Sequence, residues 1–193
     1  MAVVLYGPRQ DARVGTTVEA LEDINGDGHG DLLVAGHMDP EVEVRGGRAW
    51  VLHGPLLTGG GLDAVSFASV RPEGGWEFVG IEATAVGDLD GDLDGDELPD
   101  LAIAAPRDTC YGGDLAGKVH LFPGTIAGSH SGADAAMVLQ GEVFGDHAGK
   151  GLAGGFDADG DGWSDLAVGA YGHDAAGDQA GRMYLATGLT WAR

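Results

Sequence analysis

Aspartate and asparagine side chains recur at alternate positions in three short loops of the chain. Such spacing lets side-chain oxygens curl around a hard cation, and calcium is the cation that takes about six to eight oxygen ligands in proteins. The pattern is D-x-[DN]-G-D followed by a ninth-position aspartate and a leucine. The loops are DINGDGHGD at 23–31, DLDGDELPD at 92–100 and DADGDGWSD at 157–165.

The first and third loops fit a calcium site in full. Side-chain oxygens would come from positions 1, 3, 5 and 9, and a backbone carbonyl from position 7, whose ring side chain we expect to point away from the ion. Glycine at position 6 permits the turn. The predicted ligands are Asp23, Asn25, Asp27, the carbonyl of His29 and Asp31, then Asp157, Asp159, Asp161, the carbonyl of Trp163 and Asp165.

The middle loop allows two registers. The one we favour keeps the Asp-Leu junction to the next strand, whereas the other keeps the spacing from Gly80. Glu97 occupies position 6 in the favoured register, where a side chain strains the turn, so we expect a weaker site and two to three calcium ions per chain. The favoured ligands are Asp92, Asp94, Asp96, the carbonyl of Leu98 and Asp100; the alternative set is Asp88, Asp90, Asp92 and Asp96.

An EF-hand does not fit these loops. Position 12 holds Val34 and Val168, where an EF-hand needs a bidentate glutamate, and the residues that follow favour strands. Without a cation, the crowded carboxylates would repel one another. The sequence therefore predicts structural calcium sites that precede strands.

Charge and composition narrow the class of protein. The 193 residues carry a formal net charge of −21, which disfavours nucleic acid as a partner, and no apolar run is long enough for membrane insertion. A hydrophobic content of 44% is enough to bury a core. The single cysteine, Cys110, excludes an intramolecular disulfide.

Short strands surround each Asp-rich loop. The loops begin at 23, 92 and 157, so the unit recurs after 69 and then 65 residues, a spacing typical of repeat architectures. Four strands per unit match the antiparallel blade of an all-β propeller. The expected strands precede the loops (17–21, 83–87, 151–154), follow them (32–36, 101–106, 166–170), lie between glycines (47–54, 117–124, 181–188) or form outer strands (64–70, 136–140).

These repeats resemble the FG-GAP family, whose members form the α-subunit propeller of integrins and occur in many bacterial surface proteins. The resemblance covers essentially the whole chain. It rests on the Asp-rich loops, on a hydrophobic-Gly pair before each inner strand and on a degenerate Gly-Ala-Pro-like triplet after the loop. The pairs are Val14-Gly15, Val79-Gly80 and Phe144-Gly145, and the triplets are Ala35-Gly36-His37, Ala104-Ala105-Pro106 and Gly169-Ala170-Tyr171.

The strand count predicts how the propeller closes. We expect a single unit over 1–193, with an outer strand at 1–7 and blades at about 14–71, 78–141 and 144–193, the last without its outer strand. Three blades cannot close a ring, since about four to eight are usual. We therefore expect a head-to-tail homodimer with six blades, in which each N-terminal strand completes the partner's last blade; the alternative is a fragment of a longer propeller.

The resemblance implies a calcium-binding, integrin-like module for protein interaction or adhesion, located outside the cell or at its surface. The sequence holds no G-x-S-x-G motif and no motif around Cys110, so we do not expect an enzyme. An extracellular protein is the partner expected besides a second copy. Two alternatives are an accessory propeller domain of a secreted hydrolase and a propeller fragment with only a structural role.

Overall fold

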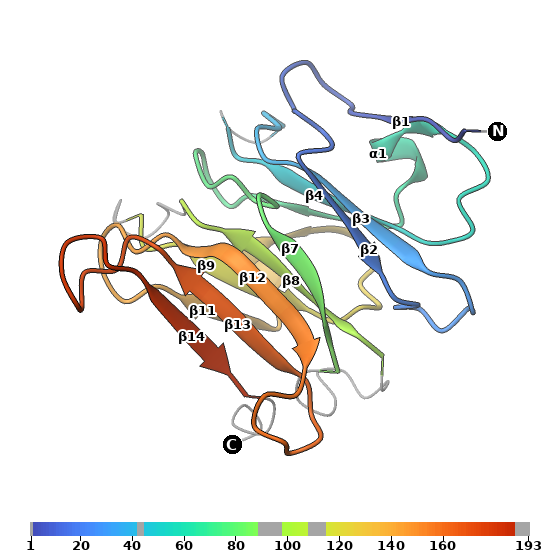
Figure 1. The fold of residues 1–193 in the computed structure, drawn as a ribbon. Helices are drawn as coiled ribbons and strands as arrows, with labels where there is room; N and C mark the ends of the chain where they lie inside the picture. Colours follow the sequence, from blue (N-terminus) through green and yellow to red (C-terminus); the bar gives the residue numbers. More distant parts are fainter. Residues whose placement is uncertain (1, 42–44, 89–97, 108–114, 188–193) are drawn as a thin grey trace.

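A computed structural model describes residues 2–41, 45–88, 98–107 and 115–187. Its described part is all-β, with open sheets and only two short helical turns, α1 (Leu62–Val65) and η1 (Gly132–Asp134) (Figure 1). No helix among these residues is long and apolar enough to cross a lipid bilayer. The expected all-β class is therefore confirmed.

Sheet 1 consists of β2 (Thr17–Leu21), β3 (Asp31–Gly36), β4 (Arg48–Leu52) and β6 (Ala68–Arg71), paired antiparallel in that order. A fifth strand, β10 (Gly128–Ser131), pairs in parallel with β6. The five residues of β4 are all buried, as expected for a central strand that is covered on both faces.

Sheets 2 and 3 repeat this arrangement. Sheet 2 has the antiparallel strands β7 (Ala83–Gly87), β8 (Asp100–Ala105), β9 (Lys118–Phe122) and β11 (Met137–Gln140). Sheet 3 has β12 (Ala148–Phe156), β13 (Asp165–Ala170) and β14 (Arg182–Ala186), so β14 is its edge in the described residues.

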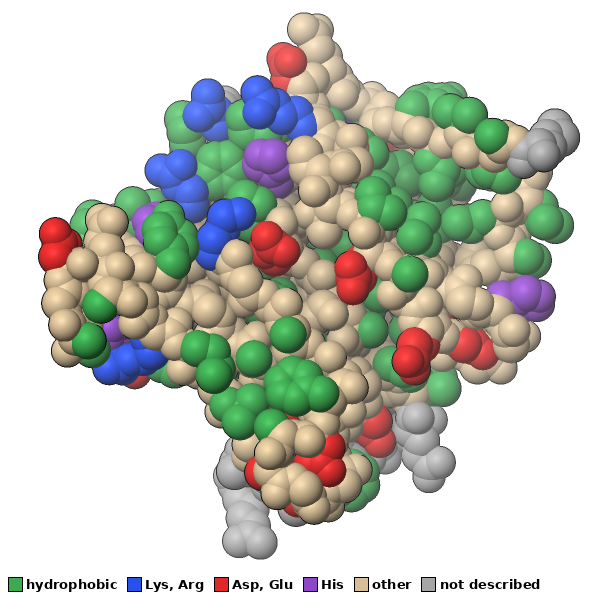
Figure 2. Space-filling model, in the orientation of Figure 1, with side chains coloured by type: hydrophobic (Ala, Val, Ile, Leu, Met, Phe, Trp, Pro, Cys, Tyr) green, Lys and Arg blue, Asp and Glu red, His purple; other side chains and the backbone are tan. Residues whose placement is uncertain are grey.

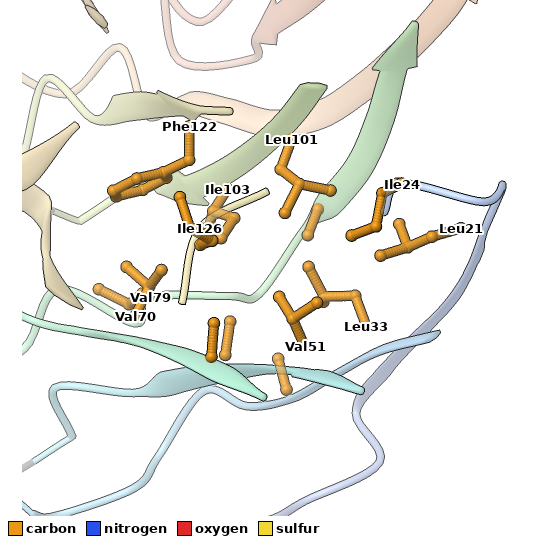
Figure 3. Packing of buried hydrophobic residues seen from close by; sticks show 14 of the residues in the cluster. Leu21, Ile24, Leu33, Val51, Val70, Val79, Leu101, Ile103, Phe122 and Ile126 are labelled. Atoms are coloured by element: carbon orange, nitrogen blue, oxygen red, sulfur yellow. The ribbon is translucent and has the colours of Figure 1, made fainter. Parts of the chain in front are cut away.

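The sheets stack face to face, and apolar clusters fill the two junctions. Leu33 and Val51 of sheet 1 meet Leu101, Ile103 and Phe122 of sheet 2 (Figure 3). The second junction holds Ala102, Ala104, Val119 and Leu121 of sheet 2 against Leu166, Val168 and Ala170 of sheet 3. Apolar burial between successive sheets is thus what holds the repeat units together.

Glycines allow adjacent sheets to approach closely. A Cβ on Gly80 would lie 2.6 Å from Ala35 Cβ, and one on Gly149 would lie 2.9 Å from Ala104 Cβ. Both glycines have positive φ, which a side chain would disfavour. Ala104 has the same position in β8 as Ala35 has in β3, so Gly149, which packs against Ala104, corresponds to Gly80. The third hydrophobic-Gly pair is therefore Ala148-Gly149, and the expected pair Phe144-Gly145 was wrong.

The first outer strand is shorter than expected. Residues 64–70 were predicted as a strand, but α1 covers Leu62–Val65 and β6 begins only at Ala68. The helical turn places Leu62 in the cluster over Trp50, and Trp50 Nε1 donates a hydrogen bond to Asp63 Oδ1 at 3.0 Å. Burial of Leu62 and a partner for the indole N–H explain the local break in the strand.

The N-terminal strand also differs from the expectation, because it has a partner within its own chain. β1 (Leu5–Tyr6) pairs in parallel with β5 (Gly60–Gly61). The pairing resembles that of β6 with β10, since β5 and β10 both follow the third strand of a sheet. β1 therefore occupies the position that the outer strand of a preceding sheet would have relative to sheet 1. It is paired within its own chain.

Candidate metal sites

The first and third Asp-rich loops lie at the same end of the stacked sheets (Figure 1). The first joins β2 to β3 and the third joins β12 to β13. The middle residues Asp92, Asp94 and Asp96 of the favoured register, with Asp90 of the alternative, lie outside the described residues.

A buried aspartate anchors the end of each loop. Asp31 is 4% exposed and accepts hydrogen bonds from Ile24 N at 3.0 Å and Gly54 N at 2.8 Å. Asp165 is fully buried and accepts one from Ala158 N at 2.7 Å. Each position-9 carboxylate thus ties the second residue of its loop to the start of the next strand.

The position-1 carboxylates close the turns in the same way. Asp23 Oδ2 accepts a hydrogen bond from Gly28 N at 2.7 Å, and Asp157 Oδ2 accepts one from Gly162 N at 3.0 Å. The φ angles of these glycines are +88° and +93°. The expected need for glycine at position 6 is met in both loops, because a side chain rarely adopts this conformation.

Asp27 at position 5 of the first loop has several partners. Its Oδ1 accepts a hydrogen bond from His29 N at 2.9 Å and lies 3.1 Å from His29 Nδ1. The pKa of Asp27 is lowered, chiefly by the backbone N–H of His29. The His29 ring therefore lies against the Asp27 carboxylate.

The third loop gathers three carboxylates. The ligand oxygens of Asp157, Asp159 and Asp165 lie within 4.8 Å of one another. Two oxygens bound to one calcium ion, each at about 2.4 Å, are at most about 5 Å apart, so this spacing suits calcium. Burial and then the neighbouring Asp161, Asp165 and Asp157 raise the pKa of Asp159, as crowded carboxylates require.

Asp161 and Trp163 complete the predicted third set. Trp163 N donates a hydrogen bond to Asp161 Oδ1 at 2.9 Å, the counterpart of the bond from His29 N to Asp27. Asp161 is not part of the carboxylate cluster. In the first loop, Asn25 replaces the position-3 aspartate, and its Nδ2 donates to Asp27 Oδ2 at 3.3 Å.

Two ligands predicted for the middle loop fall within the described residues. Asp100 begins β8 and is buried, as Asp31 and Asp165 are at the starts of β3 and β13. Leu98 is half-buried just before it. The equivalent place of Asp100 agrees with the register that keeps the Asp-Leu junction.

Sequence reasoning missed the role of Ile24 at position 2 of the first loop. This side chain is fully buried in the junction between sheets 1 and 2, close to Leu21 and Leu101 (Figure 3). Its counterpart in the third loop, Ala158, is exposed. An isoleucine within an acidic loop was the available signal, because a strongly apolar residue there suggests an anchor in the core.

Comparison with known proteins gives one consistent result. No protein-family model matches the chain. It is 33% identical to integrin alpha-PS2 of Drosophila melanogaster over 165 residues, which is 80% of this chain and 11% of that protein. Mouse integrin alpha-7 is 34% identical over 178 residues, which is 90% of this chain and 14% of that protein. Chicken integrin alpha-V is 33% identical over 190 residues, which is 88% of this chain and 16% of that protein.

The resemblance to the integrin α-type FG-GAP propeller is thereby confirmed. The matches span most of this chain, whereas the chain spans only 11% to 16% of the length of these relatives. The similarity therefore concerns the region that carries the stacked sheets and the Asp-rich loops.

Proposed function

We propose that the chain is a calcium-binding, integrin-like β-propeller module that mediates protein interaction or adhesion at the cell surface or outside the cell. The carrying observation is the shared geometry of the two described loops, each closed by a position-1 and a position-9 carboxylate before a buried strand. Its occurrence in a chain similar to integrin α subunits supports this function over an enzymatic one.

Calcium has a structural role in this proposal. The loop carboxylates join the second strand of a sheet to the strand before it, and a bound cation would neutralise charges that otherwise repel. The predicted ligands Asp23, Asn25, Asp27 and Asp31 would hold one ion, and Asp157, Asp159, Asp161 and Asp165 a second. The carbonyls of His29 and Trp163 would add a ligand to each, and a third ion would belong to the middle loop.

Thermal unfolding in calcium, magnesium and EGTA tests the calcium proposal. A ligand that binds only the native state stabilises it by about 2.7 kcal/mol at a hundredfold excess over Kd. We expect EGTA to lower the melting temperature, calcium to restore it, and magnesium to restore it less. An unchanged melt in EGTA would contradict the proposal.

We also propose that other blades complete the ring, and that a second copy of the chain supplies them head to tail. In the two inner strands of sheets 1 and 2, the side chains toward the next sheet are fully buried: Leu33, Ala35, Ala49 and Val51 in sheet 1, and Ala102, Ala104, Val119 and Leu121 in sheet 2. The same positions in sheet 3 are Ala167, Gly169, Met183 and Leu185, of which Met183 is 63% and Leu185 43% exposed. In the two junctions within the chain, the front of another sheet covers this face, which supports the proposal of a further sheet against sheet 3.

Only part of the front of sheet 1 is open to another sheet. Val18 lies on this face beside Val34 and is 57% exposed, whereas Val34, Trp50 and Leu52 are already buried within the chain. β1 occupies the place of an outer strand in front of sheet 1, and sheet 3 has no such strand among the described residues. In a head-to-tail dimer, β1 would pair with β5 of its own chain and with β14 of the partner.

Sedimentation of matched variants tests this assembly. We expect a dimer for the native chain, and a folded monomer for Leu185→Glu because a charge cannot be buried in the new junction. Val143→Glu is the control, since Val143 is an exposed apolar residue in the loop between β11 and β12 and does not belong to β13 or β14. A well-folded native monomer at micromolar concentration would contradict the dimer but leave the calcium proposal intact.

A further inference from the structure

A pocket lies at the end of the sheets opposite the Asp-rich loops. Its volume is about 270 Å³. His37, Pro106 and Tyr171 line it, and each directly follows the strand that comes after an Asp-rich loop, β3, β8 or β13. Phe78 and His147 line it as well, each two residues before the glycine at which neighbouring sheets meet closely. All three sheets therefore build the pocket from equivalent positions of the repeat.

Aromatic rings form the pocket walls. His147 stacks on Tyr171 with ring centroids 5.1 Å apart and an interplanar angle of 8°. His37 and Phe78 lie 5.7 Å apart. His147 Nδ1 donates a hydrogen bond to Pro106 O at 3.1 Å, which fixes the orientation of this ring. These walls suit a flat apolar body.

Cationic side chains lie at the same place. The guanidinium of Arg107 lies 5.1 Å from the centroid of the Phe78 ring, and Lys150 is also part of the lining. Burial, and then the charges of Arg13 and Lys150, lower the pKa of His37. Among the described residues, Glu82 forms an ion pair with one of these cations: its Oε1 lies 3.8 Å from Lys150 Nζ, and both side chains are about 40% exposed.

The Asp-rich loops lie at the far end of the sheets from these cations. Figure 2 shows Lys and Arg side chains gathered around a His in the upper part of the visible face, with single acidic side chains near them and more acidic side chains toward the lower part. The six residues of β13 separate Asp165 from the pocket end of sheet 3 by about 20 Å. The screening length at physiological salt is about 8 Å, so the loops contribute little to the potential at the pocket.

We propose that this pocket binds an organic oxyanion, a carboxylate, sulfonate or phosphate carried on a flat apolar body. The aromatic walls contact the body, and Arg107 and Lys150 pair with the anionic group. Aromatic faces alone would also suit a cation. Here the neighbouring arginine and lysine repel a cation, so the charge of the pocket selects the anion. The site goes beyond the proposed structural calcium function and includes no residue of the Asp-rich loops.

Calorimetric titration of the full chain in saturating calcium tests the pocket. The probes are benzoate and benzenesulfonate, with benzylammonium as the cation of similar shape and acetate as the anion without a flat body. We expect both aromatic anions to bind, acetate to bind at least tenfold more weakly, and benzylammonium not to bind. Binding of benzylammonium as tight as that of benzoate, or no binding of either aromatic anion, would overturn the proposal.

Variants separate this pocket from non-specific charge effects. Arg107→Gln and Lys150→Gln should each weaken benzoate binding about tenfold, the usual loss for one hydrogen bond to a charged group. Arg182→Gln removes the same charge as Arg107→Gln from a half-buried arginine that pairs with Glu142 and does not line this pocket, and it should leave binding unchanged. Lys150 is 42% exposed, so its variant carries the test if Arg107→Gln does not fold. Unchanged affinity in Lys150→Gln, or an equal loss in Arg182→Gln, would overturn the proposal.

Discussion

The first and third Asp-rich loops share a hydrogen-bond pattern but differ in what fixes them to the protein. In the first loop, Ile24 is fully buried between sheets 1 and 2, and Asn25 takes the place of one carboxylate. In the third, Ala158 is exposed and four aspartates remain. Apolar burial stabilises the first loop without a cation, whereas the third has more charge to neutralise and less apolar surface to bury. The same loop pattern can thus be stabilised mainly by apolar burial or mainly by neutralisation of its charge.

The largest effect should come from the apolar anchor. Ile24→Ala removes a fully buried side chain and should cost about 2–5 kcal/mol of unfolding free energy, measured by urea denaturation in calcium. Ala158→Gly, at the equivalent exposed position, should cost less than about 1 kcal/mol. Similar losses in both variants would show that the two loops do not differ in anchoring.

Calcium removal should act unequally on the two loops. We expect EGTA to lower the protection of amide hydrogens in 157–165 by about a hundredfold, equivalent to about 2.7 kcal/mol, and those in 23–31 by less. Hydrogen exchange followed by mass spectrometry resolves the two peptides. The strands β4 and β9 serve as the internal reference. An equal loss of protection in both loops would show that calcium stabilises them equally.

Exchanging the position-3 residues should shift calcium affinity between the loops. Asn25→Asp adds a carboxylate and should tighten the first site, whereas Asp159→Asn should weaken the third. A tenfold change in each, about 1.4 kcal/mol, is the expected scale. Calcium titration calorimetry of the single and double variants measures it. A double variant in which the order of affinities stays as in the native chain would argue that charge count does not set the order.

An effect of similar size concerns turn geometry, and here we expect no difference between the loops. Gly28→Ala and Gly162→Ala place a side chain at φ of +88° and +93°, with no heavy atom within 4 Å of the added Cβ in either case. The cost is therefore backbone strain alone, about 1–2 kcal/mol in both loops. Thermal unfolding in calcium should show equal shifts. A larger shift for one variant would indicate that the loops differ in backbone geometry as well as in anchoring.

Much of this fold could be predicted from local pattern. Residues 17–21 and 83–87 are strands with the expected bounds, because small and apolar residues there precede a loop that must turn. The outer strand at 64–70 was harder, since its first half turns so that Leu62 can cover Trp50. β10 was not foreseen, because its partner β6 belongs to the preceding repeat unit in the sequence.

The candidate sites, like the fold, could be predicted only in part. Asp23, Asp31, Asp157 and Asp165 were identified by spacing, but their hydrogen bonds to backbone amides were not, since residue type does not tell which N–H a carboxylate accepts from. The anion pocket was not predicted either. His37, Arg107 and Lys150 are far apart in the sequence, and only the stacking of three sheets brings them together.

The parallel pairs β6–β10 and β1–β5 have a consequence for how the molecule unfolds. β10 belongs to the chain segment of the second repeat, yet its backbone hydrogen bonds are made to the outer strand of the first. A repeat therefore cannot detach as an independent block, because its opening breaks a ladder in its neighbour. Where repeat proteins often lose their terminal units one at a time, this architecture favours a single cooperative transition, and an excision that follows the sequence repeat would cut through a folding unit.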